Sequence, residues 1–155
     1  MNMKFLALSL VLLATLVGCG SDPSTTPVPE GALMAVITRG GMCPAGACEN
    51  TILVERDGLV HLAAKPPNQL GVVPAEELAA LEQQISTVDY DELRSHPFTG
   101  TCPTAFDGQE FVYEFNAPAG IERIESCQTA VDYSSPLFSA VAAAIGTFVA
   151  LPLGE

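Results

Sequence analysis

The sequence predicts a small α+β domain, an antiparallel sheet of four or five strands with two helices packed on one face. Three observations support this prediction. Two β-rich runs, 51–56 and 59–62, flank Asp57-Gly58, a dipeptide typical of tight hairpins. Residues 109–115 place an aromatic at every second position from Phe111, as in a strand with one buried face. Between Pro74 and Val88, apolar residues recur at spacings of three and four, as on a helix.

The first half of the chain supplies three strands. The apolar, β-branched run 33–38 predicts the first strand, which Arg39-Gly40-Gly41 ends. At Asp57-Gly58 both central residues are expected to adopt positive φ, which joins strands two and three as a hairpin. Residues 65–71 contain two consecutive prolines and are expected to form a loop.

The first helix is expected to begin at Pro74, with Glu76 and Glu77 in its first turn, where negative charge complements the helix dipole. Its pattern fades between Val88 and Leu93. Residues 121–127 are expected to return as the partner of strand 109–115. Ser135 and Pro136 then resemble an N-cap and a first helical residue. The apolar stripe of this closing helix comprises Leu137, Val141, Ala144, Ile145 and Phe148. The expected order is therefore β-β-β-α-β-β-α.

The N-terminus has the three parts of an export signal. Lys4 is followed by an apolar run from Phe5 to Val17, too short and too early for a mature membrane span. The end of this run, Leu16-Val17-Gly18-Cys19, resembles the lipobox of bacterial lipoproteins. The resemblance implies cleavage after Gly18, lipid on the Cys19 thiol and anchoring of the chain to a membrane. The alternative is an ordinary signal peptide in which Cys19 is incidental.

The lipobox resemblance divides the chain into three parts. Residues 1–18 are the signal peptide, 19–30 are the lipidated cysteine and a flexible tether with three prolines, and 31–155 are a single disulfide-bearing domain. Gly20 stands where a signal for retention in the inner membrane typically has Asp. The expected location is therefore the cell envelope, at the outer membrane if the host has one.

The charge of the chain excludes one class of partner. Without residues 1–18 it has five basic and eighteen acidic residues, a formal charge of −13 spread along the sequence. Such a surface repels phosphate backbones, so no nucleic acid is expected as a partner.

Four cysteines remain in the exported domain, an even number that favours disulfides. Cys43 and Cys48 are separated by only four residues, so the preferred pairing joins them and leaves Cys102 with Cys127. Three connectivities are open. A zinc site is a further alternative, but it would need two short knuckles, and Cys102 and Cys127 are separated by twenty-four residues.

No catalytic or cofactor motif is present. His61 and His96 lie outside metal-ligand spacings, and no nucleophile elbow or phosphate-binding glycine pattern occurs. Two groups of carboxylates have the residue types of a known kind of site. Asp89, Asp91 and Glu92 could bind calcium, and Glu110 and Glu114 could act as a glycosidase pair. Neither has the remaining features of such a site. The sequence therefore predicts no enzyme, no metal and no cofactor.

The cysteine loop is the candidate binding element. It consists of Met42, Pro44, Ala45, Gly46 and Ala47 with the cysteines Cys43 and Cys48. If the two cysteines pair, the loop is rigid and small, and a pre-organised loop binds a partner at reduced ordering cost. The alternative is a disulfide that only stabilises a hairpin.

The overall layout also resembles a known family. The run Thr38-Arg39-Gly40-Gly41-Met42-Cys43-Pro44, the Asp57-Gly58 hairpin and the two helices resemble a group of small bacterial lipoproteins. The same layout is similar to emfourin, a protein inhibitor of thermolysin-like metalloproteases. Emfourin-type sequences usually have an aromatic after the double glycine, where this chain has Met42. The resemblance covers most of residues 33–149 and implies an α+β fold and protease inhibition.

These observations lead to two functional hypotheses. The first is a non-enzymatic, membrane-anchored lipoprotein that binds a protein partner, either a protease or an envelope component. The second is a structural or accessory envelope lipoprotein. An exposed apolar patch beside the cysteine loop would favour the binding module. A deep pocket with converging polar groups would favour an enzyme.

Overall fold

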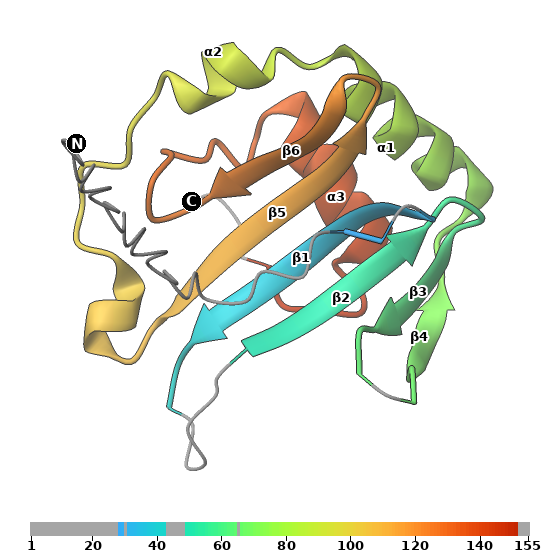
Figure 1. The fold of residues 1–155 in the computed structure, drawn as a ribbon, viewed down its shortest axis with the longest axis horizontal. Coiled ribbons are helices and arrows are strands. Elements are labelled where there is room, and N and C mark those ends of the chain that lie inside the picture. Colours follow the sequence, from blue (N-terminus) through green and yellow to red (C-terminus); the bar gives the residue numbers. More distant parts are fainter. Residues whose placement is uncertain (1–27, 30, 43–48, 65, 152–155) are drawn as a thin grey trace, which may run out of the picture.

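The computed structural model describes residues 28–29, 31–42, 49–64 and 66–151. They form an α+β domain around one antiparallel sheet, with strand order β4-β3-β2-β1-β5-β6 (Figure 1). The strands are β1 (Ala32–Gly40), β2 (Glu49–Glu55), β3 (Leu59–Leu62), β4 (Gln69–Val72), β5 (Gln109–Ala117) and β6 (Gly120–Glu125). The predicted fold class is confirmed.

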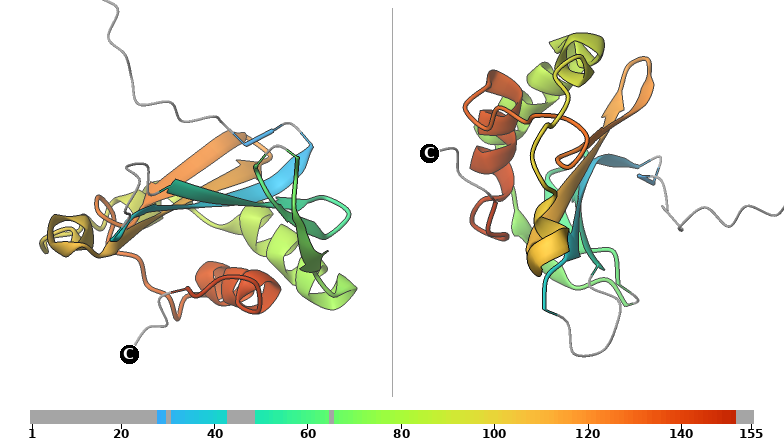
Figure 2. Two further views of the ribbon diagram at one scale, coloured as in Figure 1. Left: turned by 90° about the horizontal axis from the view of Figure 1, so that it is seen from below. Right: turned by 90° about the vertical axis from the view of Figure 1, so that its left-hand side faces the viewer.

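Two helices, α1 (Ala75–Thr87) and α3 (Pro136–Ile145), cover one face of the sheet (Figure 2). A short helix α2 (Tyr90–Arg94) and a 3-10 turn η1 (Pro103–Phe106) lie between α1 and β5. Ser135 is the N-cap residue of α3 and Pro136 its first residue, as predicted. Within the described residues, no helix is both long and apolar enough to cross a membrane.

The main core fills the space between the sheet and these helices. The predicted alternation is confirmed on this face, because the aromatic side chains of β5 are all buried there. Phe138 of α3 packs edge-on against Tyr113, with ring centroids 5.0 Å apart. The predicted stripe of α3 is buried at Leu137, Val141, Ala144 and Ile145. Burial of these apolar side chains is the main term that holds the helices on the sheet.

The sheet has six strands, not the four or five predicted. The additional strand, β4, begins within the stretch 65–71 that was expected to be loop and ends one residue beyond it. It is a four-residue edge strand that pairs only with β3. Its sequence, Gln-Leu-Gly-Val, has no clear alternation, so its pairing depends on the neighbouring β3 and not on a local pattern.

The turn at Asp57-Gly58 joins β2 and β3 as predicted, but its geometry differs. Only Gly58 has positive φ, at 87°. The Glu55 carbonyl accepts from the Gly58 N–H at 3.0 Å, and the Asp57 carboxylate accepts from the Leu59 N–H at 3.0 Å. The loop is therefore a three-residue turn that ends in a left-handed glycine, which is the next most common hairpin geometry.

The region 88–94 contains the separate short helix α2, which the fading apolar pattern did not predict. Asp89 caps α2, since its carboxylate accepts from the N–H groups of Asp91 and Glu92, each at 3.0 Å. The buried Tyr90 donates its hydroxyl to the Ile85 carbonyl at 3.1 Å. The cap starts the helix, and this contact holds it against the end of α1.

The opposite, outer face of the sheet carries a second, smaller buried cluster. Val28 packs there on Ala32, Ala35 and Leu53, and all four are buried. The Val28 N–H donates to the Glu114 carboxylate at 3.1 Å. Strand β5 is therefore covered on both faces at its centre, not on one as predicted. The packed part of the chain also reaches back to Val28, within the stretch that was expected to be tether.

Candidate partner-binding site

The end of β1 approaches η1 closely, and two glycines make this approach feasible. Gly40 and Gly41 adopt φ of 80° and 93°, a region that favours glycine. A Cβ added to Gly40 would lie 2.7 Å from both the Gly108 carbonyl oxygen and the Thr104 Cγ2. The backbone at the double glycine, at the end of β1, therefore packs directly against η1 and Gly108.

The turn η1 is held in place from its other side by a disulfide. Cys102, immediately before η1, is bonded to Cys127, which follows β6. At the far end of η1, Asp107 adopts φ of 60° and the Gly108 N–H donates to the Pro103 carbonyl at 2.8 Å. The predicted pairing of Cys102 with Cys127 is confirmed. The predicted pairing of Cys43 with Cys48 lies outside the described residues.

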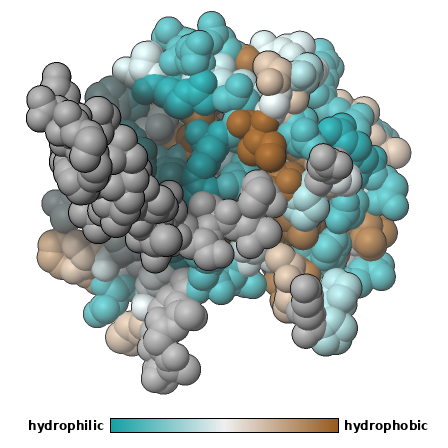
Figure 3. Space-filling model, in the orientation of Figure 1, coloured by the Kyte–Doolittle hydropathy of each residue, from teal (hydrophilic) through white to brown (hydrophobic). Residues whose placement is uncertain are grey.

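Two large apolar side chains are exposed at this end of the sheet. Met42 follows the double glycine and is 85% exposed, and Phe106 in η1 is 77% exposed. In Figure 3 the surface at the end of β1 and around η1 is pale brown, and a more strongly hydrophobic patch lies near the middle of the visible face. We call Met42 and Phe106 the apolar pair. Met42 directly precedes the cysteine loop in the sequence, and the loop residues Pro44, Ala45, Gly46 and Ala47 lie outside the described part of the chain.

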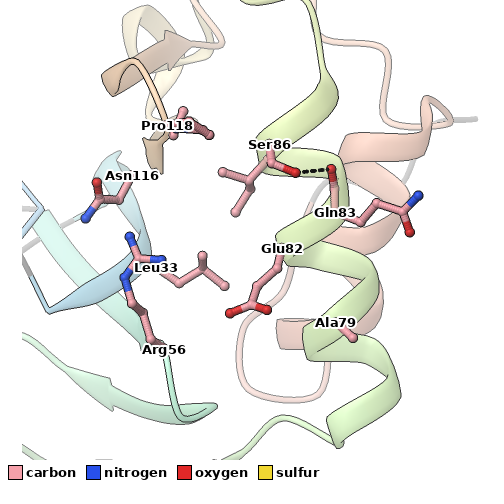
Figure 4. Close-up of a pocket in the computed structure, with 10 residues that line it drawn as sticks. Leu33, Arg56, Ala79, Glu82, Gln83, Ser86, Asn116 and Pro118 are labelled. Carbon is pink, nitrogen blue, oxygen red and sulfur yellow. Dashed lines mark hydrogen bonds between the residues drawn. The ribbon is translucent and has the colours of Figure 1, made fainter.

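A cleft of about 440 Å³ opens at the other end of the sheet, between α1 and the ends of β1, β2 and β5. Arg56 and Glu82 face each other across it, with Leu33 between them (Figure 4). The one hydroxyl in its lining belongs to Ser86, which donates to the Gln83 carbonyl at 2.9 Å. Within the described part of the chain, no histidine lines this cleft, and its one carboxylate, that of Glu82, faces Arg56.

His61 lies on the outer face of β3 and makes two hydrogen bonds. Its Nε2 is 2.8 Å from the Glu55 Oε1, and its Nδ1 is 3.0 Å from the Leu62 carbonyl oxygen. Both partners are acceptors, so the ring satisfies both only as the imidazolium. The hydrogen bond to Glu55, followed by that to Leu62, raises the pKa of His61 above its ordinary value of 6.5.

This contact predicts a pH dependence of stability. Because the pKa is raised in the folded state, the stabilisation is fully present below pH 6.5 and is lost as the pH rises through the folded-state pKa. We expect an NMR titration of the His61 ring to give a pKa above 6.5, and Glu55→Gln to bring it back towards that value. An unchanged His61 titration in the Glu55→Gln variant would contradict the assignment.

The two glutamates of the possible glycosidase pair have different surroundings: Glu110 lies beside the Cys102–Cys127 disulfide, and Glu114 is buried. Glu114 is 3% exposed and accepts from the Arg123 guanidinium as well as from the Val28 N–H. Arg123 also donates to Glu125 at 2.8 Å. Burial lowers the pKa of Arg123, but the two carboxylates more than offset this and hold it above its ordinary value. Glu114 thus holds the backbone at Val28 on the outer face.

The carboxylates considered as a calcium site also serve the local fold. Asp89 is the cap of α2, and Asp91 accepts from Arg94 at 2.7 Å. Glu92 is exposed and lies 3.8 Å from the His96 Nε2. Within the described residues, Cys102, Cys127 and Glu110 are the group close enough to share a metal ion. In that group the two sulfur atoms are bonded to each other, which leaves no thiolate as a ligand.

Sequence reasoning identified Met42 but not Phe106, because η1 is too short to have a periodic pattern. The proline that begins η1, Pro103, and the glycine two residues after its end, Gly108, were the available signal. Comparison with known proteins adds no assignment: no family model, no curated protein and no solved structure matches the chain.

Proposed function

We propose that this protein is a membrane-anchored lipoprotein whose domain binds a protein partner through the apolar pair, without enzymatic activity of its own. The observation that carries the proposal is the exposure of Met42 and Phe106 on a backbone held by a strand ladder, two left-handed glycines and a disulfide. Exposed apolar side chains on a pre-organised backbone contribute to binding with little ordering cost.

The anchoring chain restricts where the partner can be. Val28 is packed on the outer face of the sheet, nine residues after Cys19. A stretch of nine residues spans at most roughly 30 Å. With lipid on Cys19, the start of the domain stays within that distance of the membrane surface, so its partner is expected at the same surface.

Site-specific crosslinking in the native envelope tests this proposal. We expect a photoreactive phenylalanine analogue at position 106 or 42 to form a covalent adduct with one protein. Val72 is the matched control, because it is also a large exposed apolar residue, at 58%, but lies on the edge strand β4. A specific adduct from position 72 and none from positions 42 and 106 would indicate a different surface and favour the accessory envelope role.

Inhibition of a thermolysin-like metalloprotease is the most concrete form of this proposal. A chain that starts at Ser21 keeps every described residue and is incubated with the protease. We expect stoichiometric inhibition, and Phe106→Ser or Met42→Ser to weaken it about tenfold or more, as loss of an interface anchor does. Val72→Ser should leave inhibition unchanged. Absence of inhibition with a positive crosslink would exclude this form while retaining the binding module.

Lipidation is tested separately with the full-length chain. We expect the wild type to incorporate a labelled fatty acid and to yield a mature N-terminus at Cys19. Cys19→Ser should abolish both, because the thiol is the acceptor of the lipid. Ser21→Ala, two residues further on, should keep both. Incorporation of label into the Cys19→Ser variant would exclude the lipobox assignment.

A further inference from the structure

A second cavity, of about 530 Å³, lies on the helical side of the domain, between the end of α1, α2 and the start of α3. Its lining is mainly apolar and includes Val88 and the buried side chains of Leu137 and Phe138. Its size falls in the range of small-molecule sites, and sites of that kind combine an apolar floor with a few polar groups.

Apart from His96, the ionisable side chains that line the cavity are all acidic. Asp89, Glu92 and Asp132 are all exposed carboxylates, and no lysine or arginine lines the cavity. Arg94, the nearest arginine along the chain, is held outside by Asp91 and Glu122 at 2.7 and 2.6 Å. The hydrogen bond from the Ser134 hydroxyl, followed by that from its N–H, lowers the pKa of Asp132 and keeps this carboxylate ionised.

Two other groups at the cavity could favour an anion, and both are weaker. The N-terminus of α3 contributes about half a positive charge, against three carboxylates. His96 also lines the cavity, with its Nδ1 3.0 Å from the Glu92 carbonyl oxygen and its Nε2 3.8 Å from the Glu92 carboxylate. Even a protonated His96 leaves the carboxylates in excess, so the cavity attracts cations.

The walls of the cavity are tied together. The Ala130 N–H donates to the His96 carbonyl at 2.7 Å, and the Phe98 N–H donates to the Gln128 carbonyl at 2.9 Å. On the other side, the Tyr90 hydroxyl ties α2 to the end of α1. The cavity is therefore formed before a ligand enters, which reduces the ordering cost of binding.

We infer that this cavity binds a small organic cation, an ammonium group on an apolar body, with the body on the Val88, Leu137 and Phe138 floor and the charge at the carboxylates. The excess of acidic residues in the whole chain would raise the local concentration of such a ligand. This inference is independent of the proposed partner binding, because the cavity shares no residue with the apolar pair.

The test compares three probes with the same ring: 2-phenylethylammonium, neutral 2-phenylethanol and anionic 3-phenylpropanoate. Each is titrated into the chain that starts at Ser21, and amide shifts are followed by NMR. We expect the ammonium probe to bind saturably with a dissociation constant of about 1 mM or below, with shifts confined to residues 84–96 and 130–138. The neutral probe should bind several-fold more weakly and the anion not at all.

Two variants and one control locate the site. The double variant Glu92→Gln, Asp132→Asn should weaken the ammonium probe about fivefold, since it removes two charges at the rim. Ala130→Leu adds carbon atoms to the lining and should block binding of both the ammonium and the neutral probe. Glu76→Gln, in the first turn of α1 outside the cavity, is the matched charge control and should have little effect.

Three results would overturn the inference. In the first, the ammonium and neutral probes bind equally well. In the second, Glu76→Gln weakens binding of the ammonium probe as much as the double variant does. In the third, the ammonium probe shows no saturable binding up to about 10 mM, which corresponds to negligible affinity. Thermal unfolding of each variant close to that of the wild type shows that the fold is retained. Phe106→Ser, which removes one member of the apolar pair, should leave binding of the ammonium probe unchanged.

Discussion

Replacing both Cys102 and Cys127 with serine should lower the free energy of unfolding by about 3 kcal/mol. The disulfide joins residues 25 positions apart, and closing a loop of that length in the unfolded chain accounts for a change of this size. We expect a lower midpoint of urea unfolding with an equal or larger slope, because the unfolded chain without the cross-link is less compact and exposes more surface.

Loss of the Cys102–Cys127 disulfide should also have a local effect on the candidate binding site. The bond ties η1, which carries Phe106, to the segment after β6. Faster amide exchange is therefore expected at Ala105 and Gly108, whose N–H groups donate within this turn. Met42→Ser serves as the control, because this exposed side chain has no structural role and its substitution should leave stability unchanged. If the double serine variant lowers the free energy of unfolding by less than about 1 kcal/mol, the noncovalent contacts of η1 are enough to hold it in place without the disulfide.

Replacing Arg123 with methionine should destabilise the protein by about 2–3 kcal/mol at neutral pH. The Glu114 side chain is only 4% exposed and depends on Arg123 for its charge partner. Removal of one member of a buried pair leaves a buried charge without compensation. Arg123 itself is 26% exposed, so water screens part of the loss and the effect stays at the lower end of that expected for fully buried pairs.

A double-mutant cycle separates the pair from its surroundings. Replacing Glu114 and Arg123 together with methionine should recover at least half of the stability lost with Arg123 alone, because no unpaired charge then remains. Arg94→Met is the matched control. Arg94 also bridges two carboxylates, but on the exposed surface, so its loss should be about 1 kcal/mol or less. Simple additivity at positions 114 and 123 would show that the pair is not coupled.

The outcome at Glu114 also illustrates a limit of strand patterns. Alternation correctly placed Phe111, Tyr113 and Phe115 on the buried face, because each side chain points to the face opposite its neighbours. The same pattern placed Glu114 on an open face. The reason it is buried lies elsewhere in the chain, at Val28 and Arg123.

The candidate site was predictable only in part. Met42 was identified because two glycines precede it and a cysteine follows, all of which are visible in the sequence. Phe106 was not: the Cys102–Cys127 bond was predicted, but nothing local indicates that the four residues after Cys102 form a turn that lies beside β1. The cavity bordered by Asp89, Glu92 and Asp132 was not predictable for the same reason, since its walls are more than thirty residues apart.

The amino-acid sequence by itself determined the α+β class, the hairpin between β2 and β3, the two main helices and the aromatic face of β5. Each of these depends on a local period, a turn dipeptide or a helix start, and such signals lie within a few residues of one another. Only the tertiary structure decided that β4 joins the sheet, that Val28 covers its outer face and that η1 stands beside β1. Each depends on which distant segments meet, and pairing across the sheet and burial against a remote surface leave no periodic trace in the segment itself.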